Sequence, residues 1–376
     1  MSRTLHITGW LLWFLLLVPV AQANASSPEE KQGDDLDVKE FILHHVADSY
    51  EWHITRIGEK DITIPLPVIL YSSNSGWQVF LSSEFHKHTV YKGLTIAHEG
   101  KYAGKIVETD KNGVEQRPFD ISITKIALSL ILSSTLLILL IMGVARAYKK
   151  QGYNPKGKFI GLMELFIIDI YESIIKPCVG KDYKRYAPYL LTLFFFVFIN
   201  NVMGLIPFFP GGANVTGNIA VTFILAFVTF LIVNISGTRE YWKEVLWPDV
   251  PTWLKAPLPL MPAIELVGVF MKPFALMIRL FANMLAGHSI ALALICIIFV
   301  TVKMGIAMNS GMTAIAIFFS VFLSFVEILV AYIQAYVFTM LTAVFISLAR
   351  VEPHHHKKDD SQQSTVYSLQ TVDRRP

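Results

Sequence analysis

Arg279 is a charged residue in a part of the chain that is otherwise fit for the middle of a membrane. It lies within the stretch FALMIRLFANMLAGH at residues 274–288, with no acidic residue within two helical turns. A guanidinium at the centre of a membrane-spanning helix costs about 2.5–3.5 kcal/mol on insertion scales. Because nothing on its own helix neutralises Arg279, we expect another subunit to supply the counter-charge.

Three further polar residues on the same predicted helix surround Arg279 at different heights. Glu265 precedes it by 14 residues, which at about 100° per residue brings it within about 40° of the same face and about 21 Å nearer the start of the helix. Asn283 lies one turn beyond Arg279 on that face. His288 falls on the opposite face, nearer the far end. The helix therefore carries a carboxylate toward one end and an imidazole toward the other.

The last apolar run of the chain adds a second polar stripe. Glu327 and Gln334 are seven residues apart, so they share one helical face. With the polar residues of the first helix, they predict two separate polar paths, interrupted by the fixed positive charge of Arg279. The alternative interpretation is that a Glu or His near a helix end only anchors the helix at the membrane interface, and it applies most to Glu265.

The composition indicates a protein that crosses a membrane several times. The 376 residues are 53% hydrophobic and 16% charged, with a mean hydropathy of +0.48, which is far more apolar than an ordinary soluble domain. Cys178 and Cys296 are the only cysteines. We therefore expect no disulfide framework and no cysteine metal site.

Five apolar runs predict an all-α polytopic membrane protein with about five transmembrane helices. They cover residues 126–145, 188–209, 215–235, 263–302 and 312–348. As single helices, the last two would be about 60 and 55 Å long, whereas the hydrocarbon core is about 30 Å thick. Either these two helices are strongly tilted, or Pro273 and the glycines break them.

Residues 158–177 form neither a loop nor a span. Their apolar residues recur at helical spacing, while Glu164, Asp169 and Glu172 lie elsewhere on the wheel. Three carboxylates are too many for a lipid environment. We therefore expect one amphipathic helix that lies in the membrane interface.

The N-terminal third has a different organisation. Residues 1–23 read as a cleaved signal peptide, because Arg3 precedes a short apolar run and a small-residue cleavage site; the alternative is an uncleaved first span. Residues 24–118 predict a small, mainly β extramembrane domain. Its six histidines follow no recognisable ligand spacing, so we expect no metal site. The membrane domain then covers 119–350, and residues 351–376 form a disordered tail.

The distribution of lysine and arginine predicts the orientation in the membrane. The segments after the first, third and last runs carry these residues, whereas the FPGGANV loop at 209–215 has none. By the positive-inside rule, the N-terminal domain is periplasmic and the C-terminus is cytoplasmic. The expected location is thus the cell inner membrane.

Residues 120–350 resemble subunit a of the F-type ATP synthase. The resemblance rests on MPAIELVGVFMKPFALMIRLFANMLAGH at 261–288 and FVEILVAYIQAYVFTMLTAVFISLA at 325–349, with support from NNVMGLIP at 200–207 and ANVTGNIAV at 213–221. It implies that Glu265 is the acidic residue of a cytoplasmic half-channel and Arg279 the essential arginine. Asn283 and Gln334 match the conserved polar neighbours.

The same resemblance implies a role for His288 and Glu327. Some members have glutamate and histidine at these two positions in the exchanged order, as expected if the two side chains meet and share a proton relay. The outer domain at 24–118 departs from the short N-terminus of well-known members, so its role is not implied by the family.

The resemblance also implies the mechanism and the partners. Protons pass through two offset half-channels to a rotating ring of c subunits, whose carboxylate faces Arg279, and their flow drives ATP synthesis. The expected partners are this ring, the peripheral-stalk b subunits, other ATP synthase subunits and lipid, and no nucleic acid is expected. We also expect no cofactor, and no catalysis by this chain alone. The alternative is a secondary transporter or ion channel that acts alone, although no internal repeat is detectable. The HExxH motif of a metal-dependent intramembrane enzyme is absent.

Overall fold

The computed structural model describes residues 47–350, except 58–59, 73–75, 89, 98–101, 103, 110–114, 153–156, 207–210 and 247–259. The predicted signal peptide at 1–23, the start of the N-terminal domain and the predicted tail at 351–376 lie outside the described residues.

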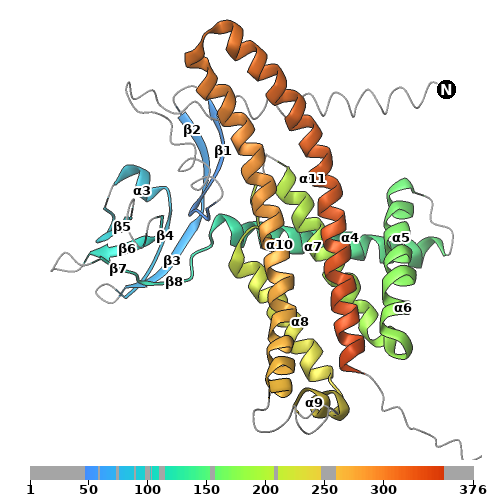
Figure 1. Cartoon of the computed structure of the whole chain (residues 1–376). Coiled ribbons are helices and arrows are strands. Elements are labelled where there is room, and N and C mark those ends of the chain that lie inside the picture. Colours follow the sequence, from blue (N-terminus) through green and yellow to red (C-terminus); the bar gives the residue numbers. More distant parts are fainter. Residues whose placement is uncertain are drawn as a thin grey trace, which may run out of the picture.

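The N-terminal region is built from short antiparallel strands (Figure 1). One two-stranded ribbon and two three-stranded sheets are formed, in the orders β1-β2, β4-β3-β8 and β5-β6-β7. A helix of four residues, α3 (Glu84–Lys87), follows β4. The strands are β1 (Glu51–Ile57), β2 (Lys60–Pro65), β3 (Pro67–Ser72), β4 (Gly76–Leu81), β5 (Leu94–Ile96), β6 (Ile106–Thr109), β7 (Glu115–Gln116) and β8 (Phe119–Asp120).

A small core holds these sheets together. Val68 and Leu70 alternate with more exposed residues along β3 and pack with Leu94 and Ile106, as expected of a half-buried strand. Tyr50 is buried in the same core, and its hydroxyl donates to Asp120 Oδ2 at 2.5 Å. Burial, and next the hydrogen bond to Asp120, raise the pKa of the Tyr50 phenol.

The rest of the described chain is helical. Five helical segments are long and apolar enough to cross a membrane. The prediction of an all-α polytopic membrane protein with a small N-terminal β region is therefore confirmed. The helices are α4 (Lys125–Gln151), α5 (Lys158–Ile170), α6 (Lys176–Val179), α7 (Tyr183–Leu205), α8 (Ile219–Ser236), α9 (Arg239–Leu246), α10 (Leu260–Thr301) and α11 (Ile306–Ala349).

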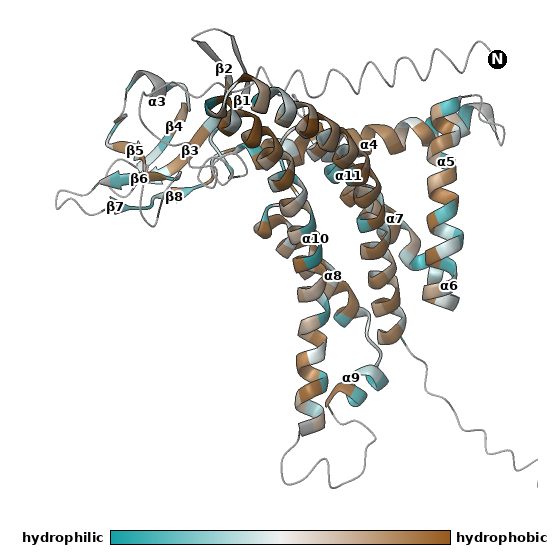
Figure 2. Cartoon of the chain, turned by 45° about the horizontal axis from the view of Figure 1, so that its top comes forward, coloured by the Kyte–Doolittle hydropathy of each residue, from teal (hydrophilic) through white to brown (hydrophobic). Residues whose placement is uncertain are grey.

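The two long helices are continuous and lie side by side. With 42 and 44 residues, α10 and α11 are each about 65 Å long. Pro273 lies inside α10 without ending it. Figures 1 and 2 show both helices running crosswise to α4. Of the two predicted alternatives, a break of these helices is thus excluded, and a strong tilt in the membrane is the one that remains.

The segment from α5 to α6 joins α7 without a non-helical break, through a π-helical turn at Tyr171–Ile175 and a 3-10 turn at Gly180–Asp182. α5 also runs crosswise to α4 in both views (Figures 1 and 2). Four of its apolar side chains are exposed, whereas Met163 and Ile170 are buried. The helix contacts α11 through Phe166, whose ring packs on Tyr332. This arrangement suits an interfacial helix, which stays a prediction.

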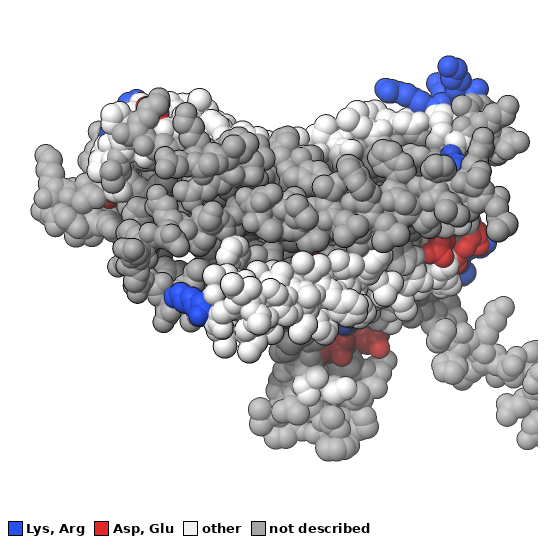
Figure 3. Space-filling view, turned by 90° about the horizontal axis from the view of Figure 1, so that it is seen from above, with Lys and Arg blue, Asp and Glu red and all other residues white. Residues whose placement is uncertain are grey.

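The helical core surrounds α7. Leu190, Phe194 and Val197 of α7 are fully buried, against Leu280 of α10 and Ala335 of α11. Small residues such as Ala335 allow close helix approach in membranes. Seen from above in Figure 3, the described surface carries its charges at the edges, while the middle is uncharged.

Candidate functional site

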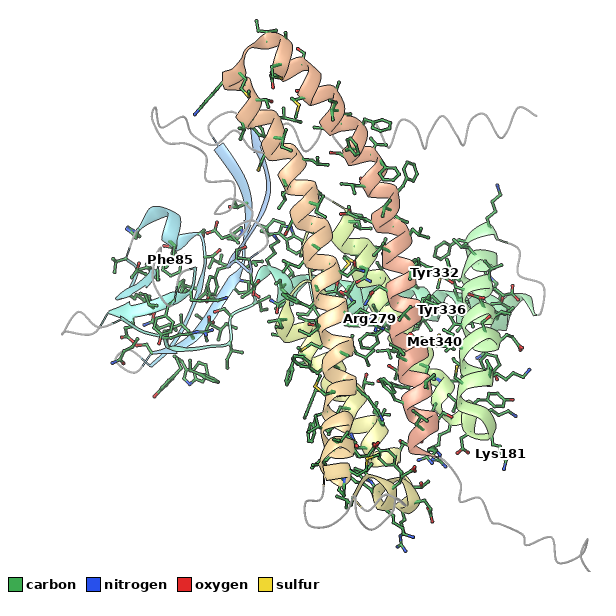
Figure 4. All side chains as sticks on the ribbon, in the orientation of Figure 1. Phe85, Lys181, Arg279, Tyr332, Tyr336 and Met340 are labelled. Carbon is green, nitrogen blue, oxygen red and sulfur yellow. The ribbon has the colours of Figure 1, made fainter. Side chains whose placement is uncertain are left out.

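Arg279 lies on an exposed part of α10 in apolar surroundings. Its neighbours in the sequence Phe274 and Ile278 are exposed, and Figure 4 shows Arg279 level with Tyr336 and Met340 of α11. Within the described residues, nothing hydrogen-bonds or ion-pairs with the guanidinium. Arg279 thus presents a positive charge on an apolar surface, and no described residue neutralises it.

Asn283 and Gln334 form a polar pair one helical turn from Arg279. The Asn283 amide nitrogen donates to Gln334 Oε1 at 3.3 Å, which connects α10 to α11. Gln334 is buried, and its own amide nitrogen has no partner among the described groups. The pair therefore leaves an unused donor in the interior beside Arg279.

His288 contacts the end of α7. Its Nε2 atom lies 3.0 Å from the Gly204 carbonyl oxygen. Because a carbonyl only accepts, the ring donates from Nε2. A side-chain Cβ added at Gly204 would lie 3.7 Å from His288 Cε1 and 3.8 Å from the Ala213 carbonyl oxygen. The imidazole is thus held next to the segment that connects α7 to α8.

Glu327 lies close to His288 without bonding to it. A Cβ added at Gly287, the residue before His288, would lie 3.0 Å from Glu327 Oε1. Within the described residues, no hydrogen bond or ion pair joins the two side chains. The structure brings both predicted residues to the same level along α10 and α11. The imidazole of His288 bonds to the Gly204 carbonyl oxygen and not to Glu327.

Glu265 is remote from Arg279 and from the polar residues around His288. It lies 14 residues before Arg279 on the continuous helix α10, about 21 Å away along the axis. Its carboxylate is near Tyr241 of α9, where burial, and next the negative charge of Glu265, raise the pKa of the tyrosine. A cavity of about 20 Å³ beside Tyr241 is also lined by Asn234 and Lys272. It has room for about one water molecule.

Several buried polar residues were missed by the sequence analysis. Asn200 and Asn201 of α7 are fully buried: Ser133 donates to Asn200 Oδ1 at 2.8 Å, and Asn201 donates to the Ala331 carbonyl oxygen at 3.3 Å. Asn214, after α7, donates to the carbonyl oxygen of Met284 at 3.3 Å. Asn200 and Asn201 could have been recognised in the sequence, because two adjacent amide side chains in an apolar run cost free energy unless they are hydrogen-bonded.

These side chains form two sets, one on each side of Arg279 along α10. The first set, which we call the His288 set, comprises Asn200, Asn201, Asn214, Asn283, His288, Glu327 and Gln334. The second set, the Glu265 set, comprises Asn234, Tyr241, Glu265 and Lys272. Within the described ranges, no cluster of three or more His, Cys, Asp or Glu side chains could hold a metal ion. Each set holds one carboxylate, and the His288 set also holds an imidazole; these groups can accept and release protons.

The fold and these two sets define a multi-pass membrane protein with sparse buried polar groups. The family model described as ATP synthase A chain matches residues 127–347. The match covers more than half of the chain, so the chain belongs to this family, and the predicted resemblance is confirmed. Residues 41–121 match a second family model, described as a domain of unknown function (DUF8433).

Individual relatives support the same family membership. The chain is 39% identical to ATP synthase subunit a of Chloroherpeton thalassium over 250 residues, which cover 64% of this chain and 71% of the relative. It is 35% identical to ATP synthase subunit a of Myxococcus xanthus over 287 residues, which cover 74% of this chain and 90% of the relative.

Proposed function

We propose that this chain is the proton-translocating stator subunit of an ATP synthase and provides two offset half-channels to a rotating ring of c subunits. Membership of the ATP synthase A chain family supports the assignment. The observation that carries it is the position of Arg279, exposed on α10, without a partner among the described residues and between the two polar sets.

In this proposal, the His288 set forms the half-channel on the periplasmic side. His288 and Glu327 lie at one level of the helix pair. The buried amides of Asn201 and Gln334 and the half-buried amide of Asn283 continue the polar surface toward Arg279. A proton that passes along them neutralises a carboxylate on the ring, and that carboxylate then turns into the lipid.

The Glu265 set forms the half-channel on the cytoplasmic side. After nearly a full turn, the ring carboxylate meets Glu265, which accepts the proton and releases it past Tyr241.

Arg279 separates the two half-channels electrostatically. An opposite charge within a few ångströms favours the ionised form of a carboxylate, so the guanidinium promotes release of the proton before the ring carboxylate moves on. Its fixed positive charge also opposes direct passage of protons from one set to the other. The ring carboxylate is the counter-charge that Arg279 does not find among the described residues of this chain.

The orientation follows from the charge distribution. Lys149 and Lys150 at the end of α4 support a cytoplasmic position for that end, and the β domain at the start of α4 is then periplasmic in this proposal. The partners in this proposal are the c ring, the peripheral-stalk b subunits and the other ATP synthase subunits. The chain itself catalyses no reaction and conducts protons only within the complex.

Reconstitution tests this proposal against a transporter or channel that acts alone. Vesicles that contain the purified chain should show no proton flux under an imposed potential. Vesicles that contain the chain with its c ring should conduct protons. Flux from the chain alone, equal to that of the complex, would favour the autonomous channel.

A further inference from the structure

The β domain is docked on the membrane domain through Trp52. This β1 side chain is only 2% exposed and forms one cluster with Ala213 and Val215, which follow α7. Partly buried apolar residues complete the cluster: Ile64, Leu128, Leu130, Leu132 and Val221. Figures 1 and 2 show β1 and β2 on the side of the β domain that faces the helices.

Two hydrogen bonds hold the residues just before Trp52 against α4. The amide nitrogen of Lys125 donates to the Ser49 carbonyl oxygen at 2.9 Å, and that of Ile126 donates to Asp48 Oδ1 at 3.1 Å. Both donors belong to the first turn of α4, whose amides have no partner within the helix. The start of β1 is therefore held against α4 and against the segment after α7 at the same time.

The segment that Trp52 contacts also holds α10. Asn214 lies between Ala213 and Val215 and is itself buried. Its oxygen accepts from the Gly217 amide nitrogen at 2.8 Å, and its nitrogen donates to the Met284 carbonyl oxygen at 3.3 Å. A Cβ at Gly217 would overlap the side-chain amide of Asn214, so a larger residue here would displace that amide. The contact reaches α10 one turn before His288.

The same segment borders the bond that His288 makes. The Gly212 amide nitrogen, next to Ala213, donates to the Met203 carbonyl oxygen at 3.3 Å, and Met203 precedes Gly204. A displacement of this segment would thus shift the end of α7, which carries the Gly204 carbonyl that His288 contacts. These contacts connect Trp52 to His288 through the segment at 211–218 and the end of α7.

We propose that the β domain forms the outer support of the His288 half-channel, with Trp52 as a positioning residue that holds the segment 211–218 against α10. This inference rests on the proposed function. It gives a role to residues 41–121, which match the family of unknown function and lie outside the residues that match the ATP synthase A chain family. Trp52 acts through Asn214 and Gly204 and does not touch the ring.

The test compares tryptophan variants in the complete ATP synthase complex, reconstituted in vesicles. Passive proton flux through the membrane sector is measured after the catalytic head is removed. Trp52→Ala should lower the flux by about threefold or more, and Trp52→Phe should restore most of it because an aromatic ring refills the cluster. Trp77→Ala is the matched control, since Trp77 lies on β4 of the same domain and is 61% exposed; its flux should equal that of the unmodified complex.

A double-mutant cycle with Asn214→Ala gives a readout that general loss of stability would not reproduce. If Trp52 acts through Asn214, the two substitutions together should cost less than the sum of their separate effects. Normal flux in Trp52→Ala, the same loss in Trp77→Ala, or strict additivity with Asn214→Ala would each overturn the inference. Failure of the proposed function would look different, because the unmodified complex would then show no flux that depends on the c ring.

Discussion

Asn283 and Gln334 connect the two long helices at the level of Arg279, through a hydrogen bond of 3.3 Å between the Asn283 amide nitrogen and Gln334 Oε1. A polar contact between inclined apolar helices fixes their relative height, since sliding by one turn would break it. The position of Arg279 relative to α11 therefore depends on this pair.

Substitution of either amide should impair proton translocation. Asn283→Ala removes the donor to buried Gln334, and a buried polar group left without its partner costs about 1–3 kcal/mol. We expect each alanine variant to reduce ATP-driven proton pumping, and the double variant to be scarcely worse than either single one. Pumping rates of inverted vesicles measure this. Independent, multiplying losses would show that the pair does not act as a unit.

Gly287→Ala should disturb Glu327. The added methyl group would lie 3.0 Å from Glu327 Oε1, which is tighter than ordinary contact, so the carboxylate must shift. We expect a few-fold loss of proton flux. Gly204→Ala is the matched control, because its methyl group would meet His288 Cε1 at an ordinary 3.7 Å. A larger loss in Gly204→Ala than in Gly287→Ala would contradict the placement of Glu327.

The β domain should lose stability at high pH because of Tyr50. Burial and the bond to Asp120 raise the phenol pKa in the folded state, so the folded state holds this proton more tightly than the unfolded state. The resulting stability is fully present below the unfolded pKa of about 10 and is lost as the pH rises above it. Protease resistance of the β domain in the intact complex should begin to fall above about pH 10 and continue to fall as the pH rises further. Tyr50→Phe should show a smaller fall, and an equal fall in both proteins would exclude Tyr50 as the cause.

Cysteine labelling tests the proposed orientation. Val79 of the β domain is 67% exposed, so Val79→Cys should react with a membrane-impermeant thiol reagent added to cells whose outer membrane has been permeabilised. Native Cys178, in α6, should react only after the inner membrane is opened. The reverse pattern would exchange the two sides and, with them, the assignments of the His288 and Glu265 sets.

The isolation of Arg279 and the length of the last two helices could be predicted from the sequence, because a charge in an apolar run and the length of that run are local properties. Whether Pro273 breaks α10 could not, since neighbouring helices decide if a proline is tolerated in a membrane helix. The structure answers this with one continuous helix.

The partners of the predicted residues were harder to foresee. His288 bonds to the backbone of Gly204, 84 residues away, and every residue has a carbonyl, so no side-chain type marks the partner. Trp52 likewise contacts Ala213 and Val215, whose small apolar side chains resemble many others in the chain. Contacts of this kind follow from the tertiary arrangement of α7, α10 and β1, which sequence periodicity does not specify.

The most direct test of the proposed mechanism is the rate of ATP-driven proton pumping by complexes that carry Arg279→Ala. If the exposed guanidinium of Arg279 faces the ring carboxylate, this variant should assemble normally and pump no protons, while passive leak through the membrane sector stays equal or rises. Lys303→Ala, which removes a cation from the turn after α10, should pump at the normal rate. Near-normal pumping by an assembled Arg279→Ala complex would contradict the proposed role of Arg279 and with it the two half-channels.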